Sequence, residues 1–204
     1  MDSRRFVMDK IKLWLSKAFY PLAIYWWSMW SKVYRYLFLR KYSDVALKKD
    51  LSYTVVTEEL KKLKWTKDGF KALGDACGTP QWTQHCLNEI GEGNDQPSGY
   101  LDCDDFSIWA CNVTSQQFFP RMFAFAWQQD GKIKGHMMCL IRRKDGKLHH
   151  TGNWGLYGPH TSLRSACEEI IKVTNASSAV GWALLGKDLK VIRTGRGLPN
   201  NTIM

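Results

Sequence analysis

The sequence predicts an α+β domain in which helices come first and an antiparallel sheet follows. Apolar residues recur at helical spacing up to Val113, whereas from Met122 onward they alternate with a period of two. Asp-Gly dipeptides at 130–131 and 145–146 separate the alternating segments, as hairpin turns do. A chain of 204 residues can bury a sizeable core in one domain.

The first 42 residues form a region of their own. Basic residues are interleaved with Trp, Tyr and Phe at helical spacing, and Pro21 is expected to kink or restart the helix. The uncharged run over residues 18–31 is shorter than the roughly 20 residues of a membrane span. We therefore expect a helical extension over 1–42 and one domain over 43–204.

Three roles fit this extension: a helix packed on the domain, an anchor at a membrane interface, or a segment that docks on a protein partner. Nucleic-acid binding is the weakest interpretation, because nothing else in the chain resembles a nucleic-acid-binding module.

Charge distribution and cysteine spacing limit the kinds of site and the cellular compartment that fit this chain. The net charge is +10, yet residues 65–120 carry eight acidic residues against two basic ones. The six cysteines are far apart and show no metal-ligand spacing, so we expect no metal and no cofactor. Their pattern suits reduced thiols, in a reducing compartment such as a host cytoplasm or in a virion- or membrane-associated protein.

The remaining elements follow from local signals. A surface helix is expected near 58–64, and Thr79 followed by Pro80 should open a helix that ends at Gly91. Strands are expected over 122–128, 133–142 and 148–154. A helix over 161–174, a hairpin of 180–185 with 189–193, and a loop from Thr194 complete the chain.

Cys103 stands where a helix should begin, after a glycine and among acidic residues. The unpaired N–H groups and the positive end of the helix dipole favour a thiolate there. A nucleophile needs this placement, although a small buried residue at a helix start fits it equally well. The neighbouring Asp102, Asp104 and Asp105 are expected to serve the helix start rather than the chemistry.

A thiolate nucleophile also needs a base and a group that orients the base. If residues 145–146 form a two-residue turn, His136 lies opposite Gly155, and Asn153 is its diagonal neighbour about 7–8 Å away. His136 alternates with Met138 and Leu140, so we expect it on the apolar face that receives the Cys103 helix. His149 and His150 lie near the turn and are expected to be exposed.

These segments resemble the transglutaminase-like cysteine peptidases, which are papain-like thiol enzymes common in bacteria and phages. The segment 99–106 (GYLDCDDF) is similar to their cysteine motif, Gly135-His136 to their histidine strand, and residues 152–155 (GNWG) to the segment with their third residue. The resemblance covers roughly residues 79–159. It departs in one place, because the transglutaminase-like pattern usually has aspartate where Asn153 stands.

The resemblance implies a papain/transglutaminase-like domain that acts on a protein or peptide through a Cys103–His136–Asn153 triad. The chain would then be a thiol hydrolase, with the oxyanion held by the Cys103 N–H and a second donor from Gln96, Tyr100 or Trp82. Two alternatives remain open. One is a transglutaminase-type acyltransferase, and the other is a non-catalytic structural or docking protein that keeps the fold.

Overall fold

The computed structural model describes residues 3–64, 76–93, 101–152 and 154–200, with side chains omitted for 3–10 and 12. The helices are α1 (Ser3–Phe38), α2 (Tyr53–Leu60), α3 (Pro80–Gly91), α4 (Cys103–Val113) and α5 (Leu163–Thr174), with short 3-10 turns at Arg40–Tyr42 and Gln116–Phe118. The strands are β1 (Arg121–Gln129), β2 (Lys132–Arg142), β3 (Leu148–Gly152), β4 (Gly155–His160), β5 (Ser178–Leu185) and β6 (Val191–Arg196).

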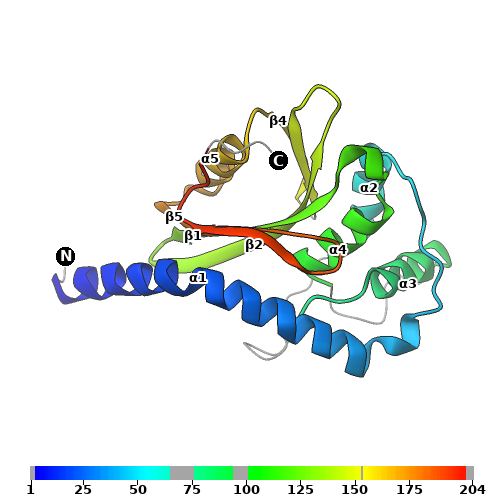
Figure 1. Cartoon of the computed structure of the whole chain (residues 1–204), viewed down its shortest axis with the longest axis horizontal. Coiled ribbons are helices and arrows are strands. Elements are labelled where there is room, and N and C mark those ends of the chain that lie inside the picture. Colours follow the sequence, from blue (N-terminus) through cyan, green and yellow to red (C-terminus); the bar gives the residue numbers. More distant parts are fainter. Residues whose placement is uncertain (1–2, 65–75, 94–100, 153, 201–204) are drawn as a thin grey trace.

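All six strands form one antiparallel sheet in the order β4-β3-β2-β1-β5-β6. Helices cover both faces of it, with α1 running along one side and α5 on the other (Figure 1). Because side chains alternate along a strand, β2 contributes side chains to two hydrophobic cores, one on each face of the sheet. Met137, Cys139 and Ile141 join the core with α1, α3 and α4, while Met138 and Leu140 join the core with α5. The α+β class is therefore confirmed.

Helix α1 is continuous through Pro21, so the helix does not restart at this residue. Its second half belongs to the domain core, where Ile24 is buried together with Leu39, the residue that directly follows the helix. Ser28 donates a 2.6 Å hydrogen bond to the Leu189 carbonyl oxygen, which ties the helix to the sheet. Residues 1–42 are thus packed on the domain in their second half, as one of the three expected roles requires. Within the described residues, no helix is long and apolar enough to cross a bilayer.

The two Asp-Gly turns differ. Asp130 and Gly131 both have positive φ and form a two-residue turn between Gln129 and Lys132. In the second hairpin only Gly146 has positive φ, and the loop spans three residues because Arg143 N–H donates to the Lys147 carbonyl oxygen. The predicted two-residue turn there is wrong. Strand β3 is shifted by one residue, so that Leu140 pairs with His150.

The strand predicted over residues 148–154 ends earlier than expected. Strand β3 stops at Gly152, and a further strand that the sequence analysis did not predict, β4, pairs along its outer edge. This cover buries His149 and His150, which are 7% and 4% exposed rather than solvent-facing. The predicted tail loop is wrong in its first part too, because β6 continues to Arg196.

Candidate active site

Helix α4 begins at Cys103 because its first turn is capped from both sides. The Asp102 side chain accepts a hydrogen bond from Asp104 N–H at 3.0 Å. Asp105 accepts one from Asp102 N–H at 3.2 Å, which completes a capping box. Asp105 also accepts a 2.6 Å bond from Gly78 N–H and joins the helix start to the segment before α3. The expected capping role of Asp102 and Asp105 is confirmed.

The Cys103 thiol has the most accessible position among the cysteines. The other five are buried, whereas Cys103 is partly exposed. Its Sγ accepts a hydrogen bond from the Met137 N–H of β2 at 3.4 Å. A hydrogen bond donated to sulfur stabilises the thiolate, and so does the N-terminus of α4. Burial raises the pKa of the Cys77 and Cys111 thiols, so both remain protonated near neutral pH.

A cavity of about 260 Å³ opens beside Cys103, between α1 and the sheet. Its lining comes from α1, from the start of α4 and from the facing positions of β1 and β2, and includes Tyr20, Ile24, Trp27, Cys103, Ala124 and Met137. Helix α1 is therefore a wall of this cavity. The helix packs closely on the sheet at Gly181, where an added Cβ would clash with the Tyr20 ring.

The contacts of α1 reach the base of α4 through Cys77. Arg35 donates to the Cys77 carbonyl oxygen at 3.0 Å, and a second guanidinium nitrogen lies 2.9 Å from Cys77 Sγ. Cys77 N–H donates to Ser31 at 3.0 Å, and Cys77 Sγ donates to the Asp104 carbonyl oxygen at 3.5 Å. These bonds hold the wall of the cavity and the helix of the nucleophile in one arrangement.

His136 also lines this cavity, but its imidazole lies on the other face of β2. It alternates with Met138 and Leu140, which pack toward α5, whereas Cys103 packs with Met137 on the α4 face. The imidazole stacks on Trp154, with ring centroids 3.8 Å apart and planes at 9°. Burial lowers the pKa of His136 to about 3, so the ring is neutral at pH 7.

The expectation that His136 faces the Cys103 helix is therefore wrong, and so is the pairing of His136 with Gly155. His136 does share a face with Met138 and Leu140, but α4 packs on the opposite face of β2, against Met137 and Cys139. The one-residue change in the β2–β3 register separately changes which residue lies opposite His136. Continued beyond the last observed pair, this register places residue 154 rather than Gly155 opposite His136, and the Trp154 ring stacks on the imidazole.

The other predicted site residues are only partly placed. Asn153, Gln96 and Tyr100 lie outside the described residues. Trp82 is in the first turn of α3, where its N–H donates to Thr79 at 3.1 Å, and its ring packs in the core. It is not among the described residues that line the Cys103 cavity.

Two groups of described residues have the composition of a metal site: Cys77 with Asp104 and Asp105, and His150 with His160 and Glu169. In the first, the Arg35 guanidinium already lies against the sulfur, and its positive charge opposes a cation. The second was missed by the sequence analysis. His150, His160 and Glu169 show no motif spacing, and only the unpredicted strand β4 brings them together.

No family model matches the chain, and no curated protein matches it.

Proposed function

We propose that this protein is a thiol hydrolase of the papain/transglutaminase-like fold, with Cys103 as nucleophile and an acyl-enzyme intermediate. The observation that carries the proposal is the position of Cys103. It is the one partly exposed cysteine, it opens a capped helix, it receives the Met137 N–H, and it faces a cavity. The motif of residues 99–106 supports the same assignment.

In the proposed reaction, the Cys103 thiol loses its proton to the neutral His136 imidazole, and the sulfur attacks an amide carbonyl carbon. The tetrahedral intermediate collapses as the C–N bond breaks, and His136 returns the proton to the leaving amine. Water then cleaves the thioester, giving a carboxylate and the free thiol. Asn153 would orient the imidazole, and the Cys103 N–H would stabilise the oxyanion.

This scheme requires one rearrangement. A general base must come within hydrogen-bond reach of the proton that it takes, and apo sites often close only when substrate binds. The His136 imidazole would leave its stack on Trp154 and turn toward the α4 face. Because His136 and Met137 are successive residues of β2, their side chains point to opposite faces, so the strand itself has to twist locally for the imidazole to reach the sulfur. Among the described residues, the β2 pairs with β3 begin only at Cys139, so this side of β2 has no β3 partner at His136 to oppose the twist.

Selective alkylation tests the nucleophile. We expect iodoacetamide at neutral pH to modify Cys103 at least about tenfold faster than any other cysteine, because only a partly exposed thiolate reacts readily. Peptide mass spectrometry of the native protein would locate the adduct. His136→Ala should slow the reaction, and His85→Ala, a change at a partly exposed histidine on α3, should not.

Equal labelling of all six cysteines, or an unchanged rate in His136→Ala, would favour the non-catalytic alternative. Selective labelling leaves hydrolysis and acyl transfer to be separated by product mass. A product that gains the mass of an added amine indicates transfer, whereas simple cleavage indicates hydrolysis.

A second function is supported by the outer face of α1, which we propose binds an anionic membrane surface. Large apolar side chains on this face, three or four residues apart, are all more than 40% exposed: Leu15, Phe19, Leu22, Trp26, Met29, Val33 and Tyr36. Such a continuous exposed patch indicates a binding surface. Aromatic residues are enriched at membrane interfaces, and residues 1–42 carry nine basic residues against two acidic ones, which favours anionic lipid.

Co-sedimentation with vesicles of phosphatidylserine and phosphatidylcholine tests this surface. We expect Leu22→Ser combined with Trp26→Ser to lower the bound fraction several-fold, because these side chains are 65% and 66% exposed and should insert. Ile192→Ser, at a 52% exposed position on β6, is the matched control. Deleting residues 1–42 is a poorer test, since Ile24 and Leu39 belong to the core. Equal binding by both variants, or a dimer in light scattering that the double variant abolishes, would reject the membrane proposal.

A further inference from the structure

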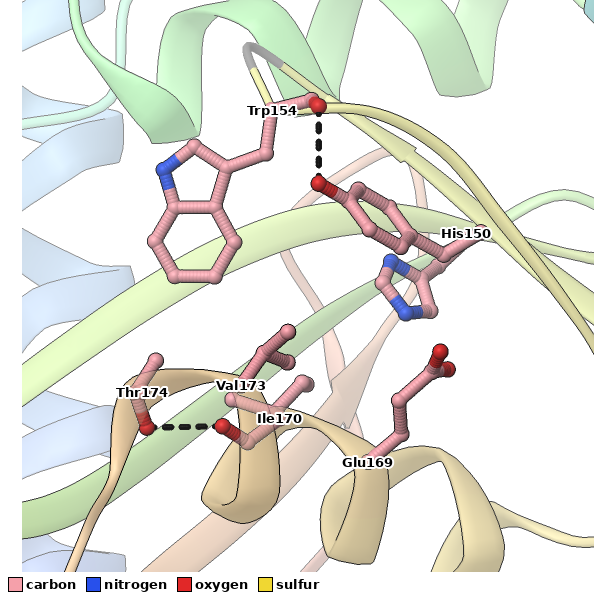
Figure 2. Close-up of a pocket in the computed structure, with 7 residues that line it drawn as sticks. His150, Trp154, Glu169, Ile170, Val173 and Thr174 are labelled. Atoms are coloured by element: carbon pink, nitrogen blue, oxygen red, sulfur yellow. Dashed lines mark hydrogen bonds between the residues drawn. The ribbon is translucent and has the colours of Figure 1, made fainter.

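The face of the sheet opposite Cys103 carries a second cluster of chemically active side chains. His150 comes from β3, His160 is the last residue of β4, and Glu169 comes from α5. One ligand atom from each lies within 4.8 Å of the others. Figure 2 shows Glu169 extending from α5 with its carboxylate toward the His150 imidazole.

The two imidazoles are buried without the partners that buried polar atoms normally have. His150 is 4% exposed and His160 is 6% exposed, and neither Nε2 atom has a hydrogen-bond partner. His160 Nε2 lies 3.3 Å from a Glu169 carboxylate oxygen, yet the pair lacks hydrogen-bond geometry. Unsatisfied buried polar atoms are rare in proteins, so two neighbouring imidazole nitrogens without hydrogen-bond partners need an explanation.

We propose that His150, His160 and Glu169 bind a divalent transition metal ion of the zinc class. Imidazole nitrogen and carboxylate oxygen are the ligands such ions take, and two histidines with one carboxylate are a known three-ligand set. With metal–ligand bonds of about 2.0–2.2 Å, tetrahedral ligands stand roughly 3.3–3.5 Å apart. The separation of His160 and Glu169 already has this value.

The protonation states suit coordination. A histidine must be neutral to ligate, and burial lowers the pKa of His150 to about 3. Burial also lowers the pKa of His160, against the opposing effect of Glu169. The imidazole planes of His150 and His160 are nearly parallel, at 6° with centroids 5.2 Å apart. The ligand atom of His150 lies within 4.8 Å of those of His160 and Glu169, so its side chain would rotate toward them when the ion binds.

The cluster also leaves room for a further ligand. A cavity of about 270 Å³ lies against it, lined by His150, Glu169, Trp154 and Tyr157 together with residues of α5. Three protein ligands and an open position are the arrangement of zinc sites that bind water or substrate. A metal ion here would tie β3 and β4 to α5. This site is separate from the Cys103 cavity, so it stands whether or not Cys103 is a nucleophile.

Metal titration of the tag-free, chelator-treated full-length protein tests the site. We expect calorimetry to show one equivalent of Zn²⁺ bound, and Co²⁺ to give visible absorption without a thiolate charge-transfer band, because no cysteine is a ligand. Glu169→Gln should weaken binding by about 100-fold or more, since loss of even an outer-shell partner costs 10–100-fold. Glu169 is 42% exposed at its side chain, so this variant should fold.

His160→Gln should weaken binding similarly, and Zn²⁺ should raise the melting temperature of the wild type but not of Glu169→Gln. His85→Gln, which removes an imidazole 3.6 Å from Glu89, and Cys103→Ser are the controls expected to bind normally. Absence of stoichiometric binding, a thiolate band, or full affinity in Glu169→Gln would each overturn the proposal.

Discussion

Trp154→Ala should raise the pKa of His136 from about 3 toward its ordinary value near 6.5. Burial is what lowers this pKa, and the indole ring that covers the imidazole at 3.8 Å is the cover most easily removed. Trp154 is itself 41% exposed, so the variant should fold. Titration of the histidine resonances by NMR measures the shift. The variant should also alkylate faster at Cys103, because the imidazole is released from the stack.

The same change alters the pH dependence of stability. In the wild type the folded state holds His136 neutral, while the unfolded chain binds a proton below about pH 6.5. Stability from this group is therefore present above pH 6.5 and is lost as pH falls toward 3. The loss is about 1.4 kcal/mol for each pH unit in that window.

Urea unfolding at several pH values should show that the free energy of unfolding falls less steeply with decreasing pH in Trp154→Ala than in the wild type. Trp26→Ala, which removes a 66% exposed indole on α1, should leave both the histidine titration and this pH dependence unchanged. If His136 still titrates near pH 3 in Trp154→Ala, the strands rather than the indole exclude water from the imidazole. The proposal that Trp154 holds the imidazole away from Cys103 would then be wrong.

Trp109→Ala should lower the free energy of unfolding by about 3–5 kcal/mol, the cost of removing a large aromatic side chain from a core. Trp109 is fully buried on α4, and its indole N–H donates to the Gln84 side-chain oxygen at 3.1 Å. The change leaves a cavity between α3 and α4 and weakens the support of Cys103. Because domains are stable by only about 5–15 kcal/mol, the variant should be close to unfolding at 37 °C.

The urea midpoint at constant slope measures this loss. Trp109→Phe keeps most of the volume and should cost less, and Trp26→Ala should cost less than about 0.5 kcal/mol as an exposed substitution. A similar loss in Trp109→Ala and Trp26→Ala would contradict the placement of α4 as the anchored element.

Local signals in the sequence were sufficient for most of the secondary structure. Thr79 and Pro80 open α3 as expected, and the Asp130-Gly131 turn sets the register of β1 and β2. The same dipeptide at 145–146 was misread because a two-residue and a three-residue turn both accept Asp-Gly. They differ in which residues take positive φ, and Asp145 adds its own 3.0 Å bond from Lys147 N–H.

The site was less predictable because it depends on which face each strand presents. The position of Cys103 follows from its capping residues, which are local. His136 shares a face of β2 with Met138 and Leu140 as expected, but which of the two faces receives α4 is decided by tertiary packing. The burial of His150 depends on β4, a short strand with glycine and proline in it. The spacing of apolar residues does not show which face of α1 packs on the domain, because both faces of the helix are rich in apolar residues.

The size of the Cys103 cavity limits what the thiol can meet. Its volume of about 260 Å³ is smaller than the roughly 300–1,000 Å³ of sites for drug-sized ligands. With α1 as one wall and the sheet as another, a cavity of this size would admit one side chain or a chain end, but not a folded surface, if Cys103 is the nucleophile proposed above. A reactive cysteine in this position would not react with the folded surfaces of most proteins. It would react only with an amide in a side chain or chain end narrow enough to enter the cavity.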